Sequence, residues 1–499
     1  MRKLLSAAVI GAVTLSSASL YAAPLETGLR STVGPVYNKQ AGVSSLYNPA
    51  SGAYHRDSTR SSAYVHTAFN MEAGLEYGNI DKLFEYIDGL ANRLNGDSGD
   101  GGGSGGDGGN GGDGGNGGNG GGGFPGDINL PPEFDINNPD LEATLDYVAR
   151  EAAIVGGLIG LVGAQAYATA DYGFDIPLLI NRDVFGGTLA FKLSSQSQSS
   201  AVGIPEALNF DKEQARAALD SLLALNEDSP AQTFQLSSGL LLSVDPQGEQ
   251  LLSTSFSNDS TLLTKSMNLT EFRFAYSREL GDFDSGNLYF GVEPALLYVG
   301  RSSFATRIGD ITDAESLFED IRNAEFEYKS GVTADLGIIW ATKHYQVGGE
   351  IKNLHEASFD FAERSTGDIS NASVQRRLQR ELEFQLDRQF RADASVFTAN
   401  KRWVANLSMD LNETVDPMYQ ENQWLHVSAM YNAPSRWIPS FSLGYRQNFA
   451  GSELNAVSLG ALFFDVVSLD LSSAMETVEI EDTNVPRSVA LRLGFKLAI

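Results

Sequence analysis

The chain contains 499 residues and carries a formal net charge of −28, with 63 acidic against 35 basic side chains and no cysteine. This acidity disfavours a nucleic-acid partner, because binding a phosphate backbone requires a basic face. The lack of cysteine excludes disulfides, thiolate metal sites and cysteine nucleophiles. With 42% hydrophobic residues the chain is too apolar for a disordered polymer, and its length allows one large β domain or several smaller ones.

The first 22 residues have the pattern of a secretory signal peptide. Arg2 and Lys3 precede a short apolar run from Leu4 to Leu15, and small residues surround an expected cleavage site after Ala22. The run is too short for a membrane-spanning helix. We therefore expect the chain to be exported across a bacterial inner membrane. An N-terminal amphipathic helix is the alternative interpretation.

The region from 79 to 171 combines helical patterns with a glycine-rich insertion. Apolar residues recur at helical spacing between Ile80 and Leu94 and again between Leu141 and Val155. Between these patterns, residues 96–123 contain 19 glycines in 28 positions, and such a run cannot bury enough side chain to offset the entropy of ordering it. We predict a helical region interrupted by a flexible linker, and one more amphipathic helix from Pro205 to Asn226.

The C-terminal part of the chain has a period of two. From Phe326 to Trp340, the even-numbered positions are mostly apolar or aromatic, whereas most odd-numbered positions carry charges, glycine or threonine. Several such stretches exceed ten residues, longer than the five or six usual in soluble sandwiches. The pattern predicts an all-β fold, a transmembrane antiparallel barrel over residues 172–499 with an apolar outer face and a polar lumen. A large soluble β-barrel is the alternative.

The connections between these stretches provide a further test. Outer-membrane barrels alternate short periplasmic turns with long outer loops. Counting back from Ile499, short connections alternate with long ones such as His355 to Arg380 and Ser302 to Ala324. The count reaches 14 strands, with 12 and 16 as alternatives, when three weaker strands are included: Gly187 to Ser195, Phe234 to Leu242 and Leu251 to Phe256.

The four tryptophans lie near the ends of the expected strands. Each is within about three residues of such an end, as an aromatic girdle at the membrane interface requires. They are Trp340, Trp403, Trp424 and Trp437. Their positions therefore favour a membrane barrel over a soluble one.

The polar faces of the strands carry charges of both signs. Three acidic side chains fall on these faces, and three basic ones lie on neighbouring parts of the expected wall. We predict a lumenal charge ladder, with a general acid and base pair as the alternative. The candidate ladder residues are Lys329, Asp335, Glu350, Lys352, Asp410 and Arg446.

Catalytic and metal-binding motifs are lacking in the sequence. The five histidines are scattered, without a paired spacing that would suit a metal. The one Gly-x-Ser-x-Gly match, around Ser104, lies inside the glycine-rich insertion, where a strained turn between a strand and a helix cannot form. We therefore expect no enzymatic activity, no catalytic residue, no metal and no cofactor. An outer-membrane hydrolase is the alternative, and it would require a serine and a histidine to meet across strands.

Several short motifs resemble known families. Tyr47-Asn48-Pro49-Ala50 is similar to the Asn-Pro-Ala element near the N-terminus of the FadL-type long-chain fatty acid transporter superfamily. Later motifs run from Val347 to Leu354, from Ser408 to Thr414 and from Leu443 to Asn448. Together the set resembles the conjugal transfer TraF-like family of exported barrel proteins, which is related to the FadL group. This resemblance implies a 14-stranded barrel in the outer membrane of a Gram-negative cell.

The resemblance also implies an N-terminal hatch. We expect residues 23–78 to form it, with Asn48, Pro49 and Ala50 inside the lumen. Resemblance to the TraF-like family implies a structural or interaction component of conjugal transfer or envelope assembly. Its partners would then be outer-membrane lipid and proteins of the envelope or the conjugation machinery. Resemblance to FadL implies instead passive transport of hydrophobic or small solutes, although a polar lumen argues against a fatty-acid tunnel. The sequence assigns no ligand-binding residues.

Overall fold

The computed structural model describes most of the barrel and parts of the N-terminal region. The described residues are 31–36, 48–56, 64–77, 167–206, 213, 217, 230–237, 240–244, 252–256, 259–307, 324–361, 369–480 and 483–498. The expected signal peptide, the glycine-rich insertion and the two helical patterns on either side of it lie outside these residues. Most of the predicted helix from Pro205 to Asn226 does so too.

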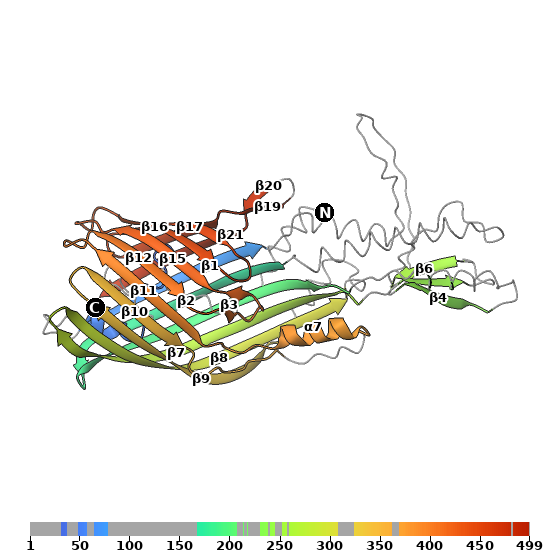
Figure 1. The fold of residues 1–499 in the computed structure, drawn as a ribbon, viewed down its shortest axis with the longest axis horizontal. Coiled ribbons are helices and arrows are strands. Elements are labelled where there is room, and N and C mark those ends of the chain that lie inside the picture. The colour runs from blue at the N-terminus through green and yellow to red at the C-terminus, as the bar shows by residue number, and fades with distance from the viewer. Residues whose placement is uncertain are drawn as a thin grey trace, which may run out of the picture.

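Fourteen described strands form a closed antiparallel barrel (Figure 1). The first strand pairs with the second and also with the last, which closes the sheet. Around the barrel the strands are β1 (Tyr64–Tyr77), β2 (Tyr167–Val184), β3 (Gly187–Ile204), β7 (Thr261–Phe283), β8 (Gly286–Arg307), β9 (Glu327–Ala341), β10 (Tyr345–Lys352), β11 (Gln389–Phe397), β12 (Trp403–Asp410), β15 (Trp424–Tyr431), β16 (Ser440–Asn448), β17 (Asn455–Phe463), β18 (Val467–Ala474) and β21 (Ser488–Ala498).

Alternation along the strands sorts side chains between the outer face and the lumen. In β9, Val332 and Ile338 are 54% and 47% exposed, whereas Thr333 and Asp335 between them are buried. Because successive residues of a strand point to opposite faces, this pattern places the apolar side chains outside and the polar ones inside. The predicted fold, an all-β barrel of 14 strands with an apolar exterior, is confirmed.

The connections follow the predicted alternation except around β16, where the connection 432–439 at one end is longer than 449–454 at the other. Short turns join the strands at the end of the barrel that carries the C-terminus, and long connections leave the opposite end (Figure 1). We call these the short-turn end and the long-loop end. Strands β7 and β8, with 23 and 22 residues, exceed the roughly 9–11 residues that a membrane crossing needs. They therefore extend beyond the membrane at the long-loop end.

Two of the expected barrel strands lie elsewhere. Residues 234–242 and 251–256 fall largely in a separate three-stranded sheet of β4 (Gln232–Ser237), β5 (Leu240–Val244) and β6 (Leu252–Phe256). This sheet lies beyond the long-loop end of the barrel (Figure 1). The three strands are only five or six residues long, too short to cross a membrane. The sequence-based assignment of these strands was wrong although the total of 14 was right.

β1 and β2 are the two barrel strands that replace the wrongly assigned ones. The barrel thus begins at Tyr64, before the predicted boundary at residue 172, and residues 64–77 and 167–171 are wall strands instead of hatch or helix. In β1 the outward Phe69 and Met71 are exposed while Asn70 between them is buried. β1 therefore follows the same period of two, which closure of the sheet requires.

Smaller elements occupy the connections. They are α2 (Ser51–His55), α7 (Ala372–Leu382) and the two-stranded pairs β13 (Thr414–Val415) with β14 (Glu421–Asn422) and β19 (Thr477–Ile480) with β20 (Thr483–Pro486). Of the helices that the structure describes, none is long and apolar enough to cross a membrane.

Three of the four tryptophans lie as an interfacial girdle requires. Trp340, Trp403 and Trp437 are at the short-turn end, and Trp403 and Trp437 are strongly exposed. The expectation was wrong for Trp424, which lines the lumenal cavity. Trp424 shares the inward parity of the buried Ser428 and Met430 on β15, so the alternation turns it away from lipid.

A charge on the outer face should destabilise the barrel strongly. Leu459 is the central residue of β17 and is 64% exposed on the outer face. We expect Leu459→Arg to cost about 2–4 kcal/mol, the range for a basic side chain at the bilayer midplane, in urea unfolding from lipid vesicles. The control Phe185→Arg, in the exposed turn between β2 and β3, should change stability by less than about 0.5 kcal/mol. Equal effects of the two variants would contradict the membrane orientation.

Candidate functional site

The lumen near the short-turn end contains the segment around Asn48. The Asn48 side chain donates through Nδ2 to the Gly349 carbonyl at 3.1 Å and accepts from the Ala50 amide at 2.8 Å. Pro49 and Asn48 lie so close to Gly291 and Gly337 that a Cβ at either glycine would collide with them. Small residues on the inner wall thus admit this segment, which α2 continues.

A second N-terminal segment, residues 31–36, contacts the inner wall nearby. The Thr32 hydroxyl bonds to Asp470 and lies 2.7 Å from the Ser442 hydroxyl. Val33 and Val36 are fully buried in a cluster with Phe397, Val404 and Met430. We refer to the described residues 31–36 and 48–56 together as the hatch. The hatch occupies the short-turn half of the lumen.

Charged side chains cross the inner wall above the hatch. The buried Arg273 of β7 forms ion pairs with Glu271 at 2.8 Å and Glu293 at 3.4 Å, and it pairs closely with Asp335. The buried Arg391 of β11 pairs with Glu350 at 3.1 Å and Asp410 at 2.8 Å. We call this set the charge belt: Lys192, Glu271, Arg273, Glu293, Asp335, Glu350, Arg391 and Asp410.

The structure brings together only some of the predicted ladder residues. Asp335, Glu350 and Asp410 belong to the charge belt, but their cations are Arg273 and Arg391. Lys329 is six positions from Asp335 along the same strand, roughly 20 Å away. Lys329 instead donates to the Ser358 carbonyl at 2.7 Å. Lys352 and Arg446 line the cavity, and the Arg446 guanidinium lies over the Trp424 ring at 5.2 Å.

The two central arginines were not singled out as candidates. Arg273 does lie on the polar face of its strand, between the exposed Phe272 and Phe274. An arginine at an inward position flanked by outward aromatics is a signal that could have identified it. Lys329 and Asp335 share one face of their strand but are too far apart along it to pair. The face on which a residue lies is therefore not enough to predict an ion pair.

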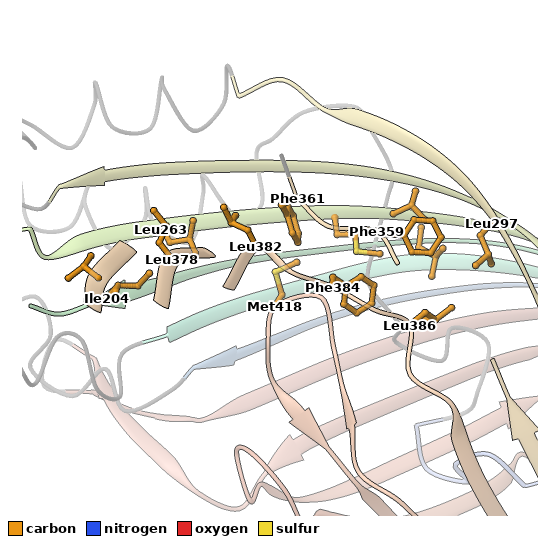
Figure 2. Close-up of a cluster of buried hydrophobic side chains, with 14 of the residues drawn as sticks. Ile204, Leu263, Leu297, Phe359, Phe361, Leu378, Leu382, Phe384, Leu386 and Met418 are labelled. Carbon is orange, nitrogen blue, oxygen red and sulfur yellow. The ribbon is translucent and has the colours of Figure 1, made fainter. Parts of the chain in front are cut away.

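The connection between β10 and β11 packs against the inner wall in the long-loop half of the lumen. Its side chains Phe359, Phe361, Leu378 and Leu382 pack against inward residues of β7 and β8 such as Leu263 (Figure 2). We call the described residues 353–361 and 369–388 the apolar cap. The cap buries the apolar upper part of the inner wall, which would otherwise face water.

Polar contacts fix both ends of α7 in the cap. At its N-terminus, the Asp259 carboxylate accepts from the amides of Ser370 and Asn371 at 2.7 and 2.6 Å. At its C-terminus, the buried Lys265 donates to the Glu381 carboxylate at 3.0 Å. α7 was not predicted, although Asn371 caps the helix. The spacing of Val374, Leu378 and Leu382 is a second signal for α7.

A polar cavity of about 250 Å³ lies within the lumen. Its lining includes seven acidic and five basic side chains, but few aliphatic ones. The acidic ones are Glu72, Glu76, Asp171, Glu271, Asp387, Asp410 and Asp416, and the basic ones are Lys192, Arg273, Lys352, Arg391 and Arg446. Within the described part of the chain, no group of three or more His, Cys, Asp or Glu side chains could hold a metal ion.

A loop between β12 and β15 reaches the cavity through Asp416. This carboxylate accepts from Gln198 of β3 at 2.8 Å and from the amides of Met418 and Gln420. Asp416 lies outside the membrane-spanning strands. Burial raises the pKa of Asp416 to about 6, even though these hydrogen bonds act in the opposite direction.

The chain matches the model of a known protein family. Residues 45–410 match the model of the family described as F plasmid transfer operon, TraF, protein. The chain belongs to this TraF family. The match covers the hatch motif at Asn48 and the strands from β1 to β12. No curated protein sequence matches the chain.

Several solved structures are similar to the chain. One is a mutant of the monoaromatic hydrocarbon channel TodX, with a TM-score of 0.39, 9% identity and coverage of 94% of this chain and 96% of that chain. Another is the Ralstonia pickettii toluene transporter TbuX, with a TM-score of 0.36, 9% identity and coverage of 93% and 94%. A third is a Pseudomonas aeruginosa FadL homologue, with a TM-score of 0.32, 10% identity and coverage of 96% of this chain and 99% of that chain. The TraF-family chain is an outer-membrane β-barrel by its own closed sheet and apolar exterior.

Removal of the central cation from the charge belt should destabilise the barrel. Arg273→Met leaves Glu271, Glu293 and Asp335 buried beside an apolar side chain. We expect a loss of about 3–5 kcal/mol, because breaking a buried ion pair leaves uncompensated charge, as measured by urea unfolding. The control Arg56→Met breaks a partly exposed pair with Asp183 and should cost less than about 1 kcal/mol. A loss at Arg273 no larger than at Arg56 would argue against the charge belt.

Docking of the Asp416 loop should depend on pH. The raised pKa means that the docked carboxylate favours its protonated form. Docking should therefore be strongest below the usual carboxyl pKa of 3.8 and should weaken as the pH rises through about 6. Hydrogen exchange of residues 411–423 should be faster at about pH 8 than at about pH 4, after correction for intrinsic rates. Asp416→Asn should abolish the difference, and a difference that persists in this variant would disprove the assignment.

Proposed function

We propose that this TraF-family chain is a non-enzymatic outer-membrane barrel that serves as a structural or interaction component in conjugal transfer or envelope assembly. The observation that carries the proposal is that the chain's own segments pack against the inner wall in both halves of the lumen. The hatch packs against Gly291 and Gly337 in the short-turn half, and the apolar cap packs against β7 and β8 in the other half. A barrel occupied in this way suits docking of partners better than free passage of solutes.

The family supports the conjugation part of the proposal, because TraF is described as a protein of the F plasmid transfer operon. Export by the signal peptide expected at residues 1–22 is also part of it. The buried carboxylates Asp335, Glu350 and Asp410 are paired with arginines, which favours a structural role for them over acid and base catalysis.

Photo-crosslinking in whole cells tests the interaction role. Phe185 is 94% exposed at the turn between β2 and β3, at the short-turn end, which faces the periplasm in outer-membrane barrels. A photoreactive residue at position 185 should yield discrete adducts with envelope or conjugation proteins. The matched control is the same residue at position 459, where the side chain faces lipid and adducts with proteins should be absent.

A genetic experiment complements the crosslinking. Deletion of the gene should lower plasmid transfer in a mating assay or increase the sensitivity of the envelope to detergent, and the intact gene should restore the phenotype. The proposal fails if position 185 yields no protein adduct and both phenotypes match those of the parent cells.

A second function is favoured by one specific observation. The polar cavity of about 250 Å³ between the hatch and the cap has room for a small solute. We therefore retain passive transport as the alternative, with movement of the hatch and the cap as its requirement. The charged lining favours small polar solutes over the hydrophobic ones that the resemblance to FadL implied.

A further inference from the structure

One wall of the cavity carries three carboxylates in a row. Glu72 and Glu76 lie on β1, on the same inward face as Gly74 between them. Asp171 of β2 is the register partner of Gly74, and a Cβ at Gly74 would collide with its carboxylate. The missing side chain at position 74 therefore lets Asp171 lie between the two glutamates. We call Glu72, Asp171 and Glu76 the acidic strip.

Two members of the acidic strip have no hydrogen-bond or salt-bridge partner among the described residues. Neither Glu72 nor Asp171 accepts a hydrogen bond or forms a salt bridge with a described residue. The cations elsewhere in the lining are already engaged, since Arg273 pairs with three carboxylates and Arg391 with two. The cation that acts most strongly on Glu72 is Arg492, its register partner on β21, which pairs with Asp470. Arg446 acts on both Glu72 and Asp171 and lies over the Trp424 ring. The strip therefore offers carboxyl oxygens to a ligand.

A buried hydroxyl beside the strip gives an independent indication. Thr169 is the register partner of Glu76 and lines the cavity. The residue is only 7% exposed, and its Oγ1 has no hydrogen-bond partner among the described residues. Because buried polar groups are nearly always hydrogen-bonded, Thr169 supplies an acceptor or donor for a molecule bound at the strip.

The spacing of the carboxylates defines the shape of this ligand. Glu72 and Glu76 are about 13 Å apart along β1, and Asp171 is the diagonal neighbour of each at about 7–8 Å. The three groups are therefore too spread for one metal ion, in agreement with the absence of a metal-holding group among the described residues. We propose that the acidic strip binds a linear organic cation with two or more amino groups joined by methylene chains.

Calorimetric titration of the purified full chain in detergent tests this site, with spermidine as the probe. We expect saturable binding by the wild type. Glu72→Gln and Asp171→Asn should each weaken it by at least about tenfold, and Thr169→Val by a smaller factor. The matched control Glu279→Gln removes an exposed carboxylate that accepts from Asn287 at the short-turn end and should leave the affinity unchanged. Heat-modifiable migration in gels checks that each variant is folded.

Two outcomes would overturn the proposal. Equal spermidine affinity in all folded variants would assign the binding to the acidic surface in general. A response to calcium chloride but not to spermidine, lost in Glu72→Gln, would assign the strip to a metal ion instead. If Asp171→Asn does not fold, the pair of Glu72→Gln and Glu279→Gln still decides the matter. The assay uses purified protein, so its result is independent of any role in conjugation.

Discussion

Pairing of β1 with β21 closes the barrel. In lipid every backbone amide and carbonyl must be satisfied internally, so a sheet can cross a membrane only when it closes. Inside this seam, the buried Arg492 of β21 donates to Asn70 of β1 at 2.5 Å and to Asp470 of β18 at 3.3 Å. Thr32 of the hatch also bonds to Asp470. The closure of the wall and the position of the hatch thus share one carboxylate.

Closure also determines what fills the lumen. Each strand sends every second side chain inward, and a 14-stranded wall encloses more space than these side chains fill. The hatch occupies the short-turn half, the charge belt crosses the middle and the apolar cap covers the long-loop half. Each layer matches its wall: glycines face the hatch, paired charges face one another, and Leu263 and Leu297 face the phenylalanines of the cap. The polar cavity lies where these layers leave space.

Much of the barrel could be predicted from the sequence because period-two alternation and connection length are local properties. The inward positions of Asp335 and Asp410 followed from parity alone. The sequence was less informative about which strands belong to the barrel wall, because β1 pairs with a strand more than 400 residues away. The inward residues of β1, such as Asn70 and Glu72, are polar types that are also common in loops. The short strands β4 to β6 alternate too, and alternation does not reveal whether a strand reaches across the membrane.

The site was predictable only in part for a related reason. Parity indicates which side chains enter the lumen, but strand register decides which of them meet. Arg391 reaches Glu350 and Asp410 because it is the register partner of both, whereas Lys329 is separated from Asp335 along one strand. The acidic strip depends on Gly74 lying opposite Asp171, a pairing that no local pattern specifies. α7 was hidden inside a connection expected to be a loop.

We infer that the chain's own hatch and cap obstruct the barrel. Ionic current through the purified full chain in a planar lipid bilayer measures this obstruction. We expect insertion without a steady open conductance, because the hatch and the cap interrupt a continuous water path. A steady, porin-like conductance of the intact chain would contradict it and would favour an open transport barrel.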